Sequence, residues 1–146
     1  MRPRYSKWII NSEIRQQNRE RVLKYDASQF DNFEDWFFFS HIDPVQRFWH
    51  AFGFVVGCIF YITLLFYPSW LLFLTATFFF YGAGLISHIY YDGGAGKSEP
   101  GAYNKSTPMV LKINAWTLSG TYQKRLREFV QKYPQTQEAY DLEEDP

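Results

Sequence analysis

The middle of this sequence has no charged residues. The chain of 146 residues contains 15 Lys or Arg and 15 Asp or Glu, yet none of them lies between Phe48 and Tyr91. A water-soluble domain of this size would rarely leave so long a segment without charge. This absence argues against a soluble globular protein and predicts an integral membrane protein.

A single break divides the uncharged segment. Pro68 and Ser69 separate residues of about 48–67 from residues of about 70–91. Each part matches the roughly 20 helical residues that a hydrocarbon core requires. Because so short a connection makes two helices antiparallel neighbours, the sequence predicts an all-α membrane protein built on an antiparallel transmembrane helical hairpin.

Three other features are scarce, and each argues against a class of protein. The formal net charge is zero and no basic face is sustained, which argues against nucleic acid as a partner because phosphate neutralisation needs clustered Lys and Arg. The only cysteine, Cys58, lies in the apolar segment. No internal disulfide is therefore expected, and the thiol should behave as a small buried side chain. The N-terminal residues lack the apolar core of a cleaved secretory signal.

Charge divides the chain into three regions. Residues 1–27 form a basic arm, with seven Lys or Arg before residue 25 against two Glu. Residues 28–132 form the membrane domain, and residues 133–146 form an acidic tail. From Glu138 this tail has five acidic residues and no basic one, so this part should be disordered on its own. The basic arm predicts an N-terminus on the cytosolic or matrix side, and since a hairpin crosses the membrane twice, the C-terminus is expected on the same side.

An interfacial amphipathic helix is expected before the hairpin. Within residues 28–41, Phe30, Phe33 and Phe37 recur at helical spacing, while acidic residues occupy other positions. This pattern is typical of a helix that lies in the membrane interface with its aromatic rings at headgroup depth.

A second interfacial helix is expected after the hairpin. Thr107 and Pro108 have the residue types of an N-cap and a first helical residue, and an apolar stripe follows to about residue 118. Gly120 is expected to interrupt this helix before a charged helix near residues 121–132.

Glycines are placed where the two membrane helices would meet. Gly53 and Gly57 are four residues apart in the first helix, and Gly82 and Gly84 thin the second. Small residues at this spacing allow helix backbones to approach closely in a membrane. The pattern favours close packing over scattered membrane glycines.

The three histidines are expected to meet at one end of the hairpin. His50 and His88 lie equally far from Ser69, so an antiparallel hairpin brings both to the same end. His41 precedes His50 across a break before Pro44, because the residue before a proline disfavours helix. Taken singly, a histidine at a membrane boundary is usually an interfacial polar residue, but three that converge suit a metal ion with open positions.

Three other polar residues could complete such a site. Asp43 and Asp92 are the carboxylates nearest to the histidines in the sequence, and Arg47 could hold an anionic head group through two hydrogen bonds. The metal ligands predicted from the sequence are His41, His50 and His88, and the metal suited to this donor set is iron or zinc.

The first of these segments resembles a known family. Residues 41–53 read HIDPVQRFWHAFG. This segment is similar to the H-x-x-P-x-x-R-x-x-H-x-x-G signature of the 2-hydroxy fatty-acid (2-hydroxy-palmitic acid) dioxygenase family of small multi-pass membrane proteins. The aromatic residues before this segment and the stretch from Tyr81 to His88 also resemble the family in outline, so that the similarity extends over roughly residues 30–130.

This resemblance implies an activity and a set of roles. It implies an Fe(II)-dependent dioxygenase of the endoplasmic reticulum that shortens 2-hydroxy acyl chains by one carbon. It also implies that His41, His50 and His88 are metal ligands and that Arg47 and Asp92 orient the ligands or the substrate carboxylate. The expected partners are membrane lipids or acyl chains, with the alkyl chain held in an apolar slot between helices.

A non-catalytic function is the alternative. The 15 Phe, 11 Tyr and 5 Trp are more aromatic residues than a two-helix core needs, and they could supply contacts to lipids and to other subunits. This composition allows a second hypothesis, an accessory subunit of a respiratory complex in the mitochondrial inner membrane. Sequence alone leaves both functions and both membranes open.

Overall fold

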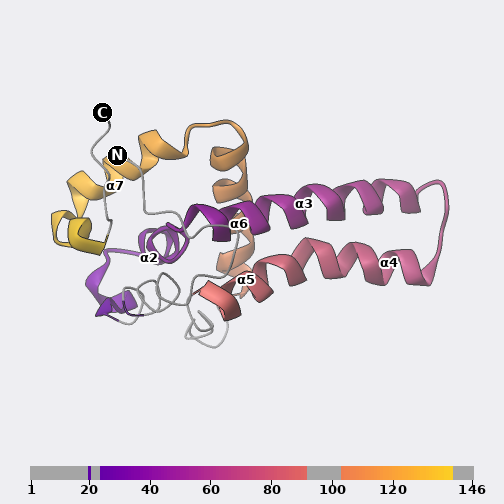
Figure 1. Cartoon of the computed structure of the whole chain (residues 1–146), viewed down its shortest axis with the longest axis horizontal. Coiled ribbons are helices and arrows are strands. Elements are labelled where there is room, and N and C mark those ends of the chain that lie inside the picture. Colours follow the sequence, from indigo (N-terminus) through magenta and orange to yellow (C-terminus); the bar gives the residue numbers. More distant parts are fainter. Residues whose placement is uncertain (1–19, 21–23, 92–102, 140–146) are drawn as a thin grey trace.

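The computed structural model describes residues 20, 24–91 and 103–139, which form an all-α fold without strands (Figure 1). Most of the predicted basic arm, Asp92 and the end of the predicted acidic tail lie outside the described residues. The elements in chain order are η1 (Ala27–Gln29), α2 (Phe33–Ser40), α3 (Pro44–Leu64), α4 (Trp70–Thr77), the π-helical segment η2 (Phe78–Gly82), α5 (Ala83–Tyr91), α6 (Tyr103–Leu118), α7 (Tyr122–Lys132) and η3 (Pro134–Ala139).

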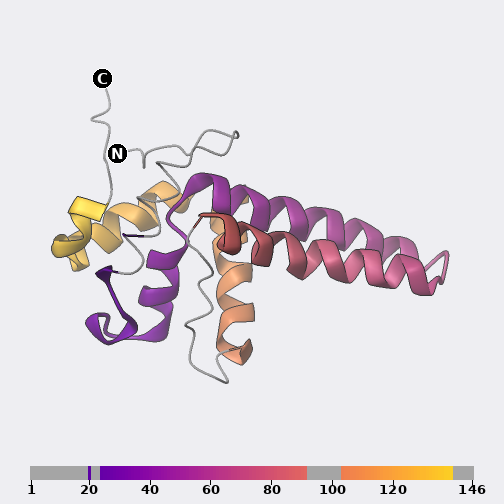
Figure 2. The ribbon, with the colours of Figure 1, turned by 60° about the horizontal axis from the view of Figure 1, so that its bottom comes forward.

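The predicted hairpin is confirmed. Figures 1 and 2 both show α3 lying antiparallel beside a second arm formed by α4, η2 and α5. The first helix begins at Pro44, before the uncharged segment, because the Asp43 carboxylate accepts hydrogen bonds from the backbone N–H groups of Val45 and Gln46. Ser69 caps α4 at the predicted turn.

Both arms of the hairpin have the length and composition of membrane spans. The segments Val45–Leu64 and Trp70–Tyr90 contain apolar windows of which only 22% and 17% of the residues are buried inside the protein. A core helix of a soluble protein would be largely covered, whereas Ile62 and Leu71 here are 59% and 74% exposed. This outward apolar surface fits a lipid environment.

Glycines allow the two arms to touch along η2. A Cβ atom at Gly53 would lie 2.6 Å from the Cβ of Ala83, and one at Gly57 would lie 2.8 Å from the Cβ of Phe80. Neither distance leaves room for a side chain, so the predicted close packing at Gly53 and Gly57 is confirmed. Gly82 does not contribute to this seam, since its nearest neighbour is the ring of Phe78 in its own arm.

The remaining helices form a small protein core at one end of the hairpin (Figures 1 and 2). Here α2 packs between α6 and α7, and its apolar side chains are covered on nearly all sides. The rings of Phe30 and Phe37 are only 7% and 8% exposed. These rings therefore pack against other protein side chains, and the expectation that the helix lies at headgroup depth stays a prediction.

The helix after the hairpin departs from its expected start. Helix α6 begins at Tyr103, and Pro108 lies inside it, not at its first position. Pro108 lies in the second turn of α6, where proline removes one helical hydrogen bond. Gly120, with a φ of 73°, separates α6 from α7 as expected, and the charged helix at Tyr122–Lys132 is confirmed.

Candidate metal centre

Three histidines from three segments meet where the hairpin joins the α2–α6–α7 core. His41 follows α2, His50 lies in the second turn of α3, and His88 lies near the end of α5. Their potential ligand atoms all lie within 4.8 Å of one another. The Nε2 atom of His88 is 3.0 Å from that of His41 and 3.2 Å from that of His50. The predicted convergence is confirmed.

The imidazole of His41 is oriented by the end of its own helix. Its Nδ1 lies 2.8 Å from the carbonyl oxygen of Phe37 and 2.8 Å from the Ser40 hydroxyl, which itself donates to that carbonyl. Since the carbonyl only accepts and the hydroxyl proton is already used, Nδ1 carries the proton and donates it. The lone pair is therefore on Nε2, the atom that faces His88. The Phe37 ring stacks on the imidazole with 4.2 Å between centroids. Histidines that bind metals characteristically donate their second ring N–H to such a carbonyl.

The close nitrogen contacts are poorly explained by hydrogen bonds among the rings alone. If His88 Nε2 carries a proton, it has no lone pair for His50 and can point that proton at only one neighbour. If it carries a lone pair, it faces the lone pair of His41 at 3.0 Å. A shared cation removes this conflict, because all three nitrogens can then present lone pairs to it.

The distances suit a metal ion as well. Two nitrogens that each lie about 2.1 Å from one ion, at a right angle or slightly more, are separated by about 3.0–3.2 Å. The pairs His88–His41 and His88–His50 have this separation, and all three ligand atoms lie within 4.8 Å of one another. Three neutral imidazoles are a donor set used for Zn, Fe, Cu and Ni, and they leave further positions open. The residues therefore fit a metal ion whose identity this geometry leaves open.

Burial favours the form of His41 that binds metal. The side chain is 1% exposed, and this burial, reinforced by His88 and His50, lowers the pKa of His41 well below its ordinary value. The imidazole is thus neutral at physiological pH. A neutral imidazole is the form that coordinates a cation.

His50 and His88 are each seated against a specific neighbour. The His50 ring lies directly over Gly84, where a Cβ atom would be 2.5 Å from Nδ1. The side-chain amide nitrogen of Gln46 lies 2.5 Å from Nδ1 of His88, and the amide oxygen on the other side of the same group has no hydrogen-bond partner among the described residues. An amide oxygen placed at this position would accept a proton from Nδ1 and leave the lone pair of His88 on Nε2, and an amide flip requires no other heavy atom to move.

Arg47 lies beside the centre and contacts its backbone. Its Nη1 group donates to the carbonyl oxygens of His41 and Ile42, and its guanidinium carbon is 3.6 Å from the centroid of the Tyr122 ring. The role in substrate binding predicted for Arg47 stays a prediction. Asp43 caps α3 and is not among the clustered ligands, and Asp92 lies outside the described residues.

Two neighbours of the centre were not predicted from the sequence. Gln46 lies one helical turn before His50, and this spacing places both residues on one face of α3. The sequence therefore contained enough information to predict that Gln46 lies beside the centre. Tyr122 is distant in sequence from every histidine and gave no signal. It reaches the centre only because α7 folds back onto α2, where Tyr122 stacks on Phe38.

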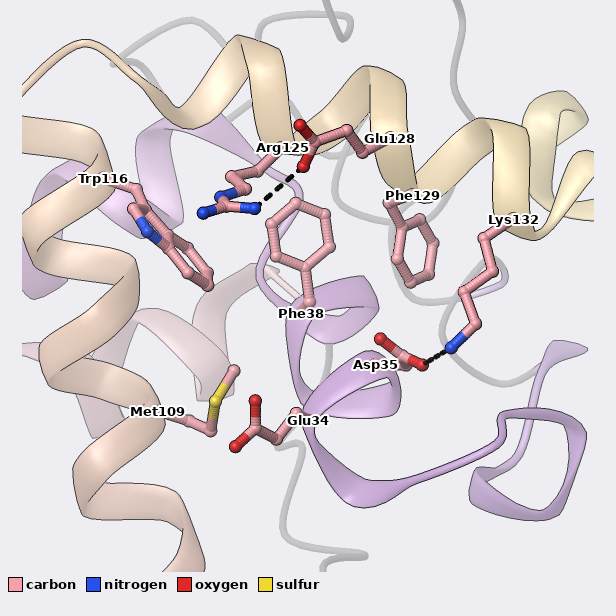
Figure 3. Close-up of a pocket in the computed structure, with 9 residues that line it drawn as sticks. All are labelled: Glu34, Asp35, Phe38, Met109, Trp116, Arg125, Glu128, Phe129 and Lys132. Atoms are coloured by element: carbon pink, nitrogen blue, oxygen red, sulfur yellow. Dashed lines mark hydrogen bonds and ion pairs between the residues drawn. The ribbon is translucent and has the colours of Figure 1, made fainter.

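A separate cavity lies away from the histidines. The cavity has a volume of about 300 Å³, and Figure 3 shows the side chains of α2, α6 and α7 that line it. Its lining residues are Glu34, Asp35, Phe38, Met109, Trp116, Arg125, Glu128, Phe129 and Lys132. Charged groups at its rim pair with one another, as in the Arg125–Glu128 and Lys132–Asp35 ion pairs. This rim gives the cavity no resemblance to an apolar slot for an alkyl chain.

Comparison with protein families identifies the hairpin region. The family described as Mpo1-like, 2-hydroxy-palmitic acid dioxygenase Mpo1-like, matches residues 27–96, a stretch that contains all three clustered histidines. No curated protein and no solved structure matched the chain. The family resemblance expected from the sequence is confirmed, and residues 27–96 of this chain are a domain of the Mpo1-like 2-hydroxy-palmitic acid dioxygenase family.

Proposed function

We propose that this protein is a membrane-bound, Fe(II)-dependent dioxygenase that shortens 2-hydroxy fatty acids by one carbon. The observation that carries the proposal is the convergence of three histidine Nε2 atoms within a domain of this family. The tautomer of His41 adds support, because the hydrogen bond to Phe37 directs a lone pair toward the other two rings.

Each residue of the centre has a role in this proposal. His41, His50 and His88 hold the metal, and bound iron would supply the redox chemistry with O₂ that removes one carbon from the substrate. Arg47 fixes the backbone of the His41 segment through two carbonyl oxygens. Asp92 remains a proposed orienting residue, carried over from the family resemblance.

The exposed surface of the hairpin supports a lipid substrate. The centre lies near the N-terminal end of α3, next in sequence to Phe48, Trp49 and Phe52, which are 37–39% exposed. A 2-hydroxy acid could place its polar end at this depth while its alkyl chain stays in the bilayer along the outer face of the hairpin. The seam at Gly53 is too tight for the chain to pass between the two arms.

Iron content and product formation together test this function. We expect protein purified from its native membrane to contain about one iron and to shorten a 2-hydroxy fatty acid, and we expect His50→Ala to lose both. Tyr61→Phe is the matched control, because it removes a hydrogen bond to Thr77 within the same hairpin, away from the histidines. A folded wild-type protein without iron, or a His50→Ala variant that retains full activity, would refute the proposal.

The organelle and the accessory-subunit hypothesis stay predictions. Two candidate membrane spans support a membrane location, and they fit the endoplasmic reticulum and the mitochondrial inner membrane equally. Co-purification of other subunits at fixed stoichiometry would favour the accessory role, whereas a single-chain species with turnover would favour the enzyme.

A further inference from the structure

The backbone of His41 is held as firmly as its side chain. Its carbonyl oxygen accepts hydrogen bonds from Arg47 Nη1 at 3.2 Å and from the Tyr122 hydroxyl at 3.3 Å. Its backbone N–H donates to the carbonyl oxygen of Phe38, and its Nδ1–H donates to that of Phe37. Nε2 is the remaining polar atom, and it faces the centre.

The two groups that hold this carbonyl form one unit. The Arg47 guanidinium lies over the Tyr122 ring in a cation–π contact, with 3.6 Å from its central carbon to the ring centroid. Both side chains are almost completely buried, at 5% and 3% exposure. Arg47 therefore contacts the face of the Tyr122 ring, and the His41 carbonyl accepts a hydrogen bond from its hydroxyl. Tyr122 links these two residues.

We infer that Tyr122 is a positioning residue for the metal ligand His41, and that α7 completes the centre from outside the family domain. Residues 27–96 contain all three histidines, yet the hydroxyl on the His41 carbonyl comes from Tyr122 in the helix Tyr122–Lys132. The inference rests on metal binding as part of the proposed function. It assigns the C-terminal helices a role in the centre besides covering α2.

The physical reason lies in where His41 sits. It follows the last residue of α2 and precedes Pro44 by a short non-helical stretch, so no helical backbone bond fixes its carbonyl. A metal site needs its ligand atoms held to within about 0.5 Å. Two donors on one carbonyl oxygen restrain the peptide plane of His41, and this restraint carries through the short side chain to Nε2.

Cobalt binding separates this role from general packing. We would measure the affinity of the full-length protein for Co²⁺ by competition with a chelating dye, and the Co²⁺ absorption spectrum, in detergent micelles. Tyr122→Phe keeps the ring under Arg47 and removes only the hydroxyl. Tyr133→Phe is the matched control, because it removes another buried tyrosine hydroxyl of the α7 region, one that holds Asp35 and Asp31 and not His41.

The expected result is specific to position 122. Tyr122→Phe should weaken Co²⁺ binding about tenfold, as substitutions of outer partners of metal ligands do, and should shift the absorption bands. Tyr133→Phe should lower the thermal midpoint about as much as Tyr122→Phe does, but it should change neither the Co²⁺ affinity nor the absorption bands. Equal Co²⁺ affinities for Tyr122→Phe and wild type, or equal losses in both variants, would overturn the inference.

A second variant covers the case in which Tyr122→Phe folds poorly. Arg47→Lys acts on the same carbonyl, and we expect it to weaken Co²⁺ binding as well, because an ammonium group cannot stack on Tyr122 and reach both carbonyls as guanidinium does. An Arg47→Lys protein with the wild-type affinity would overturn the inference. A wild-type protein that binds no Co²⁺ would instead refute the proposed metal site, and the inference with it.

Discussion

The imidazole of His50 packs directly against Gly84. A Cβ atom at this position would lie 2.5 Å from Nδ1 of His50 and 3.1 Å from its Nε2. Only glycine leaves room for the ring to lie this close to α5, where His88 lies one helical turn further along. The separation of His50 from His88 therefore depends on the absence of a side chain at residue 84.

Gly84→Ala should displace His50 and weaken metal binding. The added methyl group cannot fit while the ring stays in place, so we expect a loss of about 10- to 100-fold in affinity for Co²⁺. Gly82→Ala is the control, because a Cβ atom there would meet only the movable side chain of Phe78 at 3.1 Å. It should bind metal normally, because the added methyl group would meet Phe78 and not His50. Wild-type affinity in Gly84→Ala would contradict the role given to Gly84.

Acid should loosen the contact between α2 and the end of α7. Lys132 donates a hydrogen bond to Asp31 at 2.8 Å, and this bond, with the charge of Lys132, lowers the pKa of Asp31 below 3.8. An unfolded chain regains the ordinary value, so it binds more protons than the folded chain at low pH. The stability from this pair is thus fully present above about pH 3.8 and is lost as the pH falls below it.

Thermal midpoints at pH 5 and pH 3 test this expectation. Both wild type and Asp31→Asn should lose stability in acid through their other carboxylates, but the loss should be smaller in Asp31→Asn, which has no carboxylate to protonate at residue 31. The difference should be modest, because Asp31 is largely exposed. An identical acid response in the two proteins would show that the ion pair does not contribute.

Asn114 is expected to reduce the stability of the fold. It is 1% exposed, and within the described part of the chain neither polar atom of its side chain has a hydrogen-bond partner. A buried polar group without a partner costs about 1–3 kcal/mol. Asn114→Leu has a similar volume and should raise the free energy of unfolding by about that amount.

A second asparagine provides the contrast for this measurement. Asn32 caps α2 by accepting a hydrogen bond from the backbone N–H of Asp35 at 2.9 Å, so Asn32→Ala should lower stability by about 1 kcal/mol. If Asn114→Leu were destabilised as well, the Asn114 amide would have a partner in the folded protein, and its assignment as an unsatisfied group would be wrong.

The hairpin and the histidine cluster could be predicted because both follow from positions along the chain. An uncharged segment of this length implies two spans, and the equal distances of His50 and His88 from Ser69 imply that they meet. Residues that depend on how separate elements pack were not predictable in this way. The local pattern around Phe37 is amphipathic and does not predict which protein surface covers the ring, whereas in the structure side chains from α6 and α7, far along the chain, belong to the same core.

The surroundings of the histidines were the least predictable part of the site. The Tyr122 hydroxyl reaches His41 through the docking of α7, and no local pattern encodes that contact. The closeness of Gly84 to His50 depends on the register between two helices, which the π-helical turn at Phe78–Gly82 changes. Helical periodicity alone would place α5 in a different rotation.

Gln46 should tune the affinity of the centre through His88. Its side-chain amide lies 2.5 Å from Nδ1 of His88, the ring atom opposite the one that faces the other histidines. Gln46→Leu removes this partner, so the ring loses its orientation, and Co²⁺ affinity should fall about tenfold.

Gln46→Glu supplies a carboxylate that accepts the Nδ1 proton and makes Nε2 more basic. We expect it to bind Co²⁺ at least as tightly as wild type, measured by the same chelator competition. If both variants bound equally, the partner at Nδ1 would not influence the metal, and Gln46 would serve only to fill the space beside α5.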